Sequence, residues 1–388
     1  MCSKGRPMSR DLVLVALALF TWGVGESMFM LFQPLYLQEL GASPVSIGAI
    51  IGAMATVMAI AHIPSGYLSD RIGRRPLLWL AWVMGLGMAL VMALAQSLPI
   101  FVLGLLGYSI TAGVVAPLNS YITSARGKWS VGRALTLISA CFYLGSVIGP
   151  WLGGRIGDQI GLRQVYYFAA GVFVFSNLFI FLLRSQPVES RSEPGHPRGL
   201  QLSPAYLRFL GIVFLAVFAT FLPQPLSANF LQNQRGLSLE QIGQLGSINS
   251  LGVVALNLVL GHLDAGLGFL LAQACVGLFS LILWQTSGMP WFALGYFLLG
   301  GMRTTRALAS AQARELVGKA SMGLAFGMIE TVGSSAGMVA PVLAGWLYEQ
   351  NPTWIYPAGL AFIILSLAVS ANHVLFKKRS TGKAFDRV

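Results

Sequence analysis

Charge is scarce in this chain. Asp, Glu, Lys and Arg make up 10% of the 388 residues, whereas 55% are hydrophobic and the mean hydropathy is +0.71. Such a composition leaves too little polar surface to cover a water-soluble globule. We therefore predict an integral membrane protein.

Cysteine and the usual marks of an enzyme are scarce too. The three cysteines, Cys2, Cys141 and Cys275, have no metal-site spacing and indicate no disulfide. The sequence has no P-loop, no cluster of metal ligands in its polar connections and no nucleophile beside a base. These absences argue against an enzyme, an ATP-driven pump, and a bound metal or organic cofactor.

Long apolar runs recur along the whole chain, separated by Gly, Pro and charged residues. Each is long enough for the roughly 20 residues that cross about 30 Å of hydrocarbon, and none alternates as a barrel strand does. We predict an all-α integral membrane protein with about twelve transmembrane helices. The predicted spans are 12–37, 44–67, 76–96, 98–122, 131–156, 163–183, 205–232, 239–262, 266–287, 289–312, 320–347 and 352–375.

The basic residues are unevenly distributed between the connections. The formal net charge is +12, and most of the 25 Lys and Arg residues fall on the side of the two termini. Arg155, Arg163 and Arg235 fall on the other side. By the positive-inside rule, the chain is a multi-pass protein of the cell (plasma) membrane with both termini cytoplasmic. The charge then reflects topology and not a nucleic-acid partner.

The two halves of the sequence repeat the same landmarks. The repeated segments are Gln33-Pro34-Leu35 with Gln224-Pro225-Leu226, GASPVSIG from Gly41 with GLSLEQIG from Gly236, and the 23-residue stretch from Gly132 with that from Gly323. A parallel repeat of this kind is a transporter architecture. We expect an N-terminal six-helix half at 1–184, a cytoplasmic linker at 185–204, a C-terminal six-helix half at 205–376 and a basic cytoplasmic tail at 377–388.

Two motifs resemble those of the major facilitator superfamily. The residues after the second span resemble its signature loop: Gly66, Asp70, Arg71, Gly73, Arg74 and Arg75. The fifth span is similar to a motif of its antiporters, especially the drug:proton exporters: Gly145, Gly149, Pro150, Gly153 and Gly154. The resemblance implies the major facilitator fold and transport by rocking of two halves. One departure is Leu105, which stands where many drug:proton exporters have an arginine.

Both motifs also have a physical interpretation. Asp70 beside three arginines predicts a charge cluster that links helices when the cytoplasmic side is closed. The repeat copy at Gly261 keeps an acid, Asp264, without an arginine, so this gating charge belongs to the first half. Glycines four residues apart let two helices approach closely, and Pro150 is expected to bend its helix. The alternative for the glycines is ordinary small-residue packing.

Glu26 is an acid deep in the first span, roughly 22 Å along the helix from Asp11. Gln33 lies two turns further on the same face, just before the helix-perturbing Pro34. Because a charge inside the bilayer is costly, Glu26 is the leading candidate for a proton carrier. Several drug:proton antiporters have an acid in this span. The alternative is an acid that only packs helices together.

Arg303, Arg306 and Glu330 lie at matching depths in the tenth and eleventh spans. We expect a buried ion pair between Glu330 and one arginine. The second arginine leaves a positive charge that suits a substrate carboxylate or phosphate. The alternative is that Arg306 extends toward the inner headgroups. Further polar candidates for the site are Tyr108, Asn119, Tyr143 and Gln224, each of which could instead join two helices.

These observations predict a secondary active transporter that exports a small amphipathic or organic solute in exchange for protons, by alternating access. The alternatives are uptake or exchange of an organic anion held by Arg303 and Arg306, a lipid flippase of the same fold, and a non-transporting sensor. The expected partners are a small-molecule substrate and the lipid bilayer, with no nucleic acid. The proton is the expected coupling ion, and the chain is expected to act as a monomer.

Overall fold

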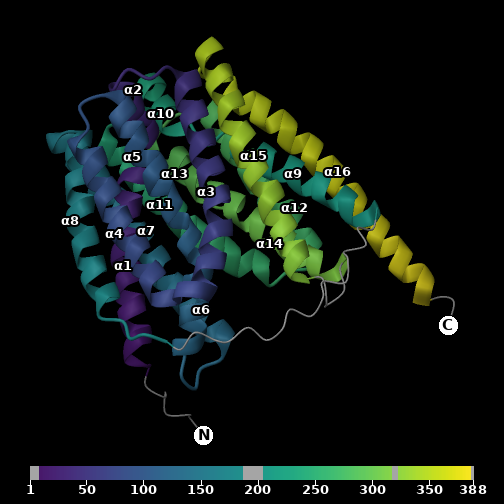
Figure 1. Cartoon of the computed structure of the whole chain (residues 1–388). Helices are drawn as coiled ribbons and strands as arrows, with labels where there is room; N and C mark the ends of the chain where they lie inside the picture. Colours follow the sequence, from purple (N-terminus) through teal and green to yellow (C-terminus); the bar gives the residue numbers. More distant parts are fainter. Residues whose placement is uncertain (1–7, 187–203, 317–321, 386–388) are drawn as a thin grey trace, which may run out of the picture. The chain divides into compact units, whose positions relative to one another are not determined.

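The computed structural model describes residues 8–186, 204–316 and 322–385, and these residues form helices and turns without a strand (Figure 1). The helices, in chain order, are α1 (Arg10–Met30), α2 (Gln33–Glu39), α3 (Pro44–Ile72), α4 (Arg74–Leu94), α5 (Leu98–Ile110), the short 3-10 helix η1 (Thr111–Val114), α6 (Val115–Ala125), α7 (Val131–Ile160), α8 (Leu162–Phe181), α9 (Pro204–Phe221), α10 (Ser227–Arg235), α11 (Leu239–Gly261), α12 (Ala265–Gln285), α13 (Met289–Leu299), α14 (Gly301–Leu316), α15 (Met322–Gln350) and α16 (Ile355–Phe385).

Breaks divide four of the predicted spans into shorter helices. The first span stops at Met30 and resumes at Gln33, and the seventh stops at Phe221 and resumes at Ser227. Both breaks contain or adjoin the repeated Gln-Pro-Leu segment, whose proline has no N–H for the helix ladder. The fourth span contains η1, and the tenth is interrupted at Gly300. Joined across these breaks, the described helices account for all twelve predicted spans.

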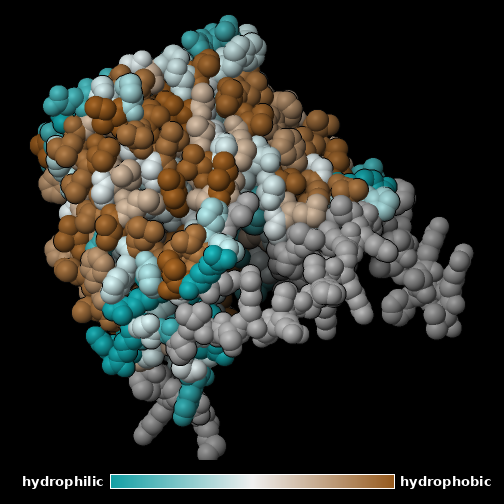
Figure 2. Space-filling view, viewed as in Figure 1, coloured by the Kyte–Doolittle hydropathy of each residue, from teal (hydrophilic) through white to brown (hydrophobic). Residues whose placement is uncertain are grey.

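Ten helical stretches in the described residues are long and apolar enough to cross a membrane. The predicted spans 289–312 and 320–347 are not among them; the first is divided into α13 with 11 residues and α14 with 16. Large apolar side chains are exposed along the helices, including Leu103 at 65% and Leu258 at 62%. Figure 2 shows apolar atoms over the sides of the helices and hydrophilic ones near their ends. Such a surface suits contact with lipid and not with water.

The chain divides into two compact units. Unit 1 comprises Met1–Ala42, Ala53–Glu193 and Leu237–Ser247, and unit 2 comprises Ser43–Gly52, Pro194–Gly236 and Ile248–Val388. In unit 1, α1 packs against α7 and α8, and α4 packs against α8 (Figure 1). In unit 2, α9 packs against α15, and α12 packs against α14 and α16. The first residues of α3 and of α11 thus belong to the unit formed mainly by the other half of the sequence.

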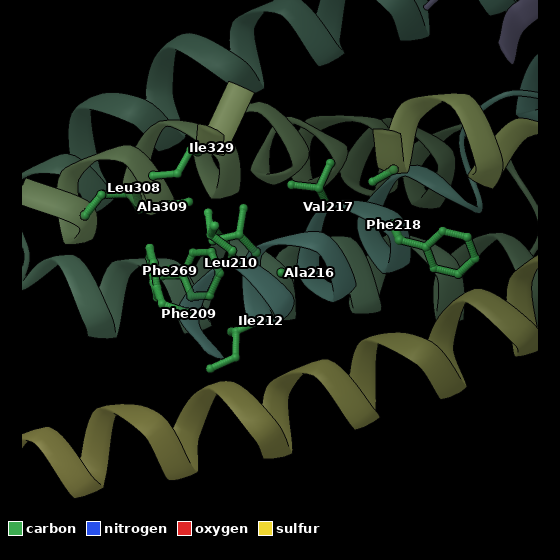
Figure 3. Packing of buried hydrophobic residues seen from close by; sticks show 14 of the residues in the cluster. Phe209, Leu210, Ile212, Ala216, Val217, Phe218, Phe269, Leu308, Ala309 and Ile329 are labelled. Atoms are coloured by element: carbon green, nitrogen blue, oxygen red, sulfur yellow. The ribbon is translucent and has the colours of Figure 1, made fainter. Parts of the chain in front are cut away.

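The core of unit 2 surrounds α9. Phe209, Leu210 and Val217 of α9 are buried together with Leu308 of α14 and Ile329 of α15. Figure 3 shows these side chains gathered along α9. This packing fixes α14 and α15, which carry the ionisable residues of the tenth and eleventh spans.

Buried polar side chains join helices within each unit. In unit 1, Trp82 Nε1 donates to Ser176 Oγ at 2.8 Å, and Ser176 Oγ donates to the carbonyl of Ala18 at 2.7 Å. In unit 2, Ser366 Oγ donates to Gln273 Oε1 at 2.6 Å, and both residues are fully buried. These bonds satisfy groups that lipid cannot solvate, so they stabilise the packing without marking a site.

Candidate functional site

Glu26 lies on α1 and is half-buried in unit 1. The indole Nε1 of Trp22, one turn earlier on the same helix, donates a hydrogen bond of 3.0 Å to Oε2 of Glu26. An indole N–H can only donate, so it holds one carboxyl oxygen in a fixed direction whether the acid is charged or neutral.

An aromatic cluster surrounds the Trp22 ring. The ring stacks on Phe173 with centroids 4.5 Å apart and on Tyr108 at 6.0 Å, and it is tilted against Trp82 at 4.9 Å. Phe173 is fully buried, and Tyr108, Trp82 and Trp22 are 3%, 2% and 8% exposed. One side of the carboxyl site is therefore lined by buried aromatic rings.

The structure adds residues to this site that the sequence prediction did not include. Trp22 has a signal in the sequence, because its position four residues before Glu26 places it on the same helix face. No pattern in the sequence points to Phe173 and Trp82, because their contact with Trp22 depends on how α8 and α4 pack on α1. Tyr108 was expected only as a general polar candidate, and its ring is what contacts the site.

The two glutamines of the repeat lie at the two helix breaks. Gln33 is the first residue of α2, 4% exposed, with its Nε2 buried and without a hydrogen-bond partner in the described structure. The regular helix stops between Glu26 and Gln33, so the expected spacing along one continuous helix does not hold. Gln224 lies in the break after α9, where its carbonyl accepts from Ser227 Oγ at 2.8 Å.

The glycines of the fifth span face α1. A Cβ built on Gly145 would lie 2.8 Å from the nitrogen of Val24, and one on Gly149 would lie 3.0 Å from the nitrogen of Met28. Gly153 also packs against the backbone of Met28. No larger residue fits at these positions without moving a backbone, so α7 lies directly on the helix that carries Glu26.

The next residues of the same motif face the beginning of α11. A Cβ on Gly154 would lie 3.0 Å from the Cα of Gly243, and the ring of Pro150 lies 2.9 Å from a Cβ built on Gly246. The helix α7 continues through Pro150 from Val131 to Ile160. It therefore contacts α1 with one face and the first turns of α11 with the neighbouring face.

The signature loop connects α3 to α4 through Gly73, whose φ of 86° suits glycine. Arg74 donates to Ser124 Oγ at 2.5 Å and to Gln186 Oε1 at 3.3 Å, which ties the start of α4 to the end of α6 and to the segment after α8. The guanidinium of Arg71 lies over Tyr67 at 4.3 Å, and that of Arg75 lies over Trp79 at 4.1 Å. The three arginines thus have three different local partners.

The signature loop contains one acid, Asp70, and its repeat copy contains another, Asp264. The side chain of Asp70 and the surroundings of Gly66 lie outside the described residues, so the predicted charge cluster remains a prediction. In the repeat copy, Asp264 Oδ1 accepts from the N–H of Leu267 at 3.1 Å. That acid caps the start of α12, which is a structural role.

Arg306 and Glu330 form an ion pair between α14 and α15. The guanidinium of Arg306 also lies beside Gly333, where a Cβ would be 3.3 Å from Nε. The Arg306 side chain is 41% exposed and that of Glu330 is 56% exposed, so the expectation of a buried pair was wrong. Ala309 and Ile329, one or three residues away, face the core instead, which turns the pair outward.

The remaining polar candidates are dispersed. Arg303 is exposed on α14 and makes no ion pair with any residue whose side chain the structure describes. Asn119 is exposed on α6, and Tyr143 on α7 is half-buried with its ring against Phe142 at 5.6 Å. The structure thus assembles one acidic and aromatic site at Glu26 in unit 1, and one ion pair between Arg306 and Glu330 in unit 2.

Comparison with known proteins decides the family. The sequence profile of the Major Facilitator Superfamily matches residues 15–263 and 209–387. The chain belongs to the major facilitator superfamily. It is therefore a multi-pass membrane transporter of small molecules and not an enzyme, and the predicted twelve-helix major facilitator fold is confirmed.

One relative of known name is a multidrug resistance protein. Multidrug resistance protein MdtG of Escherichia coli is 33% identical over 213 residues, which are 51% of this chain and 50% of MdtG. The match thus spans about half the length of that relative, and it supports the resemblance to the drug:proton antiporter branch.

Among solved structures, the nucleoside transporter NupG superposes with a TM-score of 0.81 at 13% identity, covering 94% of this chain and 99% of that chain. A bacterial homologue of the human lysosomal transporter Spinster, inward-facing and occupied, gives 0.71 at 17% identity, covering 96% and 98%. At these identities the likeness shows the fold alone.

Proposed function

We propose that this superfamily member exports a small amphipathic or organic solute in exchange for protons, with Glu26 as the proton carrier. The observation that carries the proposal is the position of Glu26, an acid in a membrane-spanning helix, held by Trp22 at 3.0 Å against a buried aromatic cluster. An acid in such surroundings gains or loses its proton when access to water changes. Binding of a solute beside it would compete with the proton, which couples the two fluxes.

The apolar surroundings also suit the proposed solute. Trp22, Phe173 and Tyr108 present flat rings next to one carboxyl group. The rings are covered in the structure described, so an amphipathic molecule would place an apolar part against them, and a polar or cationic part at the acid, only in a state in which the helices around α1 have moved apart. The similarity to half of MdtG, which is named a multidrug resistance protein, is consistent with solutes of this kind.

Alternating access is the proposed mechanism. The glycine contacts join α7 to α1 along one face and to α11 along another. Such contacts between small residues allow two helices to tilt against each other as rigid bodies. We place both termini in the cytoplasm of the cell, with the halves 1–184 and 205–376 joined by the linker 185–204. The tail at 377–388 follows the second half, and a single chain is the transport unit.

Transport by the purified chain in liposomes tests this function. An imposed pH gradient should drive ethidium across the membrane, and collapse of the gradient with an ionophore should stop it. Movement of ethidium that is independent of the gradient, or none at all with protein that is folded, would contradict the proposal. A fluorescent phospholipid in the same vesicles reports the flippase alternative.

A second candidate function is transport of an organic anion. The observation that favours it is the exposed Arg303, one turn from an Arg306 that Glu330 already neutralises. Arginine binds carboxylates and phosphates through paired N–H groups. Carboxyfluorescein, an anionic probe, should then be transported in place of ethidium, and Arg303→Gln should abolish its flux while Arg208→Gln on α9 should not.

A further inference from the structure

Asp158 of α7 makes a hydrogen bond to the first residue of α11. The N–H of Leu239 donates to Oδ1 of Asp158 at 3.1 Å. Asp158 lies near the end of α7, and both residues belong to unit 1. A carboxylate in this position accepts one of the N–H groups that a helix start leaves without a partner, and it faces the positive end of the helix dipole.

The N-terminus of α11 has a local cap that does not use the N–H of Leu239. That N–H is therefore available to Asp158. Ser238 Oγ accepts from the N–H of Gln241 at 3.2 Å, and Gln241 Oε1 accepts from the N–H of Ser238 at 3.0 Å. This reciprocal pair is a capping box and depends on α11 alone. The bond from Leu239 to Asp158, by contrast, exists only while α7 and α11 lie together.

The hydrogen bond sits at the end of a close helix contact. The Leu239 side chain is 9% exposed, and its Cδ1 lies 3.3 Å from a Cβ built on Gly157. One turn further, Gly154 and Gly243 bring the two backbones together. Leu239 is thus held to α7 through both its backbone and its side chain.

The equivalent contact in unit 2 cannot form this bond. The repeat aligns Leu239 with Pro44 and Asp158 with Glu349. The helices do meet, since a Cβ on Gly345 would lie 3.0 Å from the Cα of Val45. Pro44, however, has no N–H, so there is no donor for Glu349, which is exposed. The bond is therefore a feature of one repeat only.

We propose that Asp158 is a positioning residue of the transport cycle, which holds α11 against α7 in the state seen here and releases it when the two helices separate. The proposal rests on the alternating access proposed above. By the predicted topology, this contact lies at the non-cytoplasmic end of both helices. Loss of the bond shifts the chain toward the state in which that end is open.

Alkylation of a cysteine at the contact tests the proposal. Ile242, on the first turn of α11, is fully buried. Ile242→Cys is introduced into the full chain with its three native cysteines replaced by serine, and a membrane-impermeant maleimide is added from outside. Asp158→Ala should raise the alkylation rate roughly fivefold, the factor expected from loss of one helix cap. Asp158→Asn, whose amide oxygen can still accept, should stay close to the parent, and so should Glu349→Ala.

The outcomes separate the alternatives. An unchanged rate in Asp158→Ala, or an equal rise in Asp158→Asn, would overturn the role of the hydrogen bond. An equal rise in Glu349→Ala would overturn its restriction to one repeat. The thermal unfolding temperature of each variant shows whether the protein has folded. Because the assay needs neither substrate nor proton flux, it can succeed even where Glu26 proves not to carry protons, so failure of the two proposals is distinguishable.

Discussion

The indole Nε1 of Trp22 lies 3.0 Å from Oε2 of Glu26 and donates a hydrogen bond to it. The Trp22 ring is fixed in turn by Phe173, 4.5 Å away between centroids. The carboxyl group thus has a defined orientation because α8 packs on α1 through an aromatic pair. Chemistry at residue 26 depends on this packing as well as on the acid itself.

Trp22→Phe keeps an aromatic ring and removes the N–H donor. A hydrogen bond to a charged group contributes about 1.5–3 kcal/mol, so we expect ethidium efflux to fall by roughly tenfold or more. The unfolding temperature should fall as well, because the smaller ring leaves a gap in the buried aromatic cluster, so efflux is compared per folded molecule. In the comparison variant Trp82→Phe, the lost donor serves Ser176 and not Glu26, and a ring still packs beside Trp22, so this variant should lose thermal stability while its efflux per folded molecule falls less than in Trp22→Phe. Equal efflux in wild type and Trp22→Phe would contradict the positioning role.

Gly149→Ala tests the contact between α7 and α1. The added methyl group would meet the backbone of Val24 and Met28, which cannot yield as a side chain could. Overpacking of this kind costs about 1–3 kcal/mol, so the unfolding temperature in detergent should fall. Gly171→Ala on α8 is the matched control, because nothing lies within 4 Å of its added Cβ. That variant should be neutral or slightly stabilised, and the same result for Gly149→Ala would show that the contact is loose.

The helices could be predicted from the sequence because long apolar runs and their polar ends are local signals. The breaks next to Gln33 and around Gln224 were not predicted: Pro34 was expected to perturb its helix, but the spans 12–37 and 205–232 were each predicted as continuous. The partners of Glu26 depend on how α4, α5 and α8 pack, and no spacing in the sequence encodes that packing. The bond from Leu239 to Asp158 joins residues 81 positions apart, so it is invisible before the fold is known.

For the pair of Arg306 and Glu330, the sequence predicted the partners correctly and the burial wrongly. Similar depths in consecutive spans predicted that an arginine and the acid would meet, and they do. The depth of a residue along its helix does not show whether its side chain faces the core of unit 2 or away from it. The expected burial of the pair was therefore wrong. Exposure was decided instead by Ala309 and Ile329, which occupy the core-facing sides of α14 and α15.

Charge removal at that pair should be only mildly destabilising. The pair is about half exposed, and exposed ion pairs contribute roughly 0–1 kcal/mol. Glu330→Gln should therefore lower the unfolding temperature slightly, and the exchanged variant Arg306→Glu with Glu330→Arg should restore it. If Arg303 binds an organic anion, Glu330→Gln should also increase carboxyfluorescein uptake, since it frees a second arginine. A large loss of stability in Glu330→Gln would show that the pair is a core element instead.

Arg74→Ala should loosen one end of unit 1. It removes donors to Ser124 at 2.5 Å and to Gln186 at 3.3 Å, which together join α4, α6 and the segment after α8. We expect faster proteolysis near Gln186 and a lower unfolding temperature. Arg208→Ala removes a bond from Nε to the carbonyl of Pro204 within the same helix, the one hydrogen bond of this side chain among the described residues, so it should have neither effect. Identical proteolysis of the two variants would exclude this role for Arg74.

Proton-coupled efflux through Glu26 is tested most directly by ethidium transport in liposomes under an imposed pH gradient, with wild type, Glu26→Gln and Glu26→Asp compared. Glu26→Gln keeps the size and the hydrogen-bonding oxygen but cannot carry a proton. We predict that it loses gradient-driven efflux while still binding ethidium, and that Glu26→Asp retains part of the flux. Full gradient-driven efflux by folded Glu26→Gln would contradict the account.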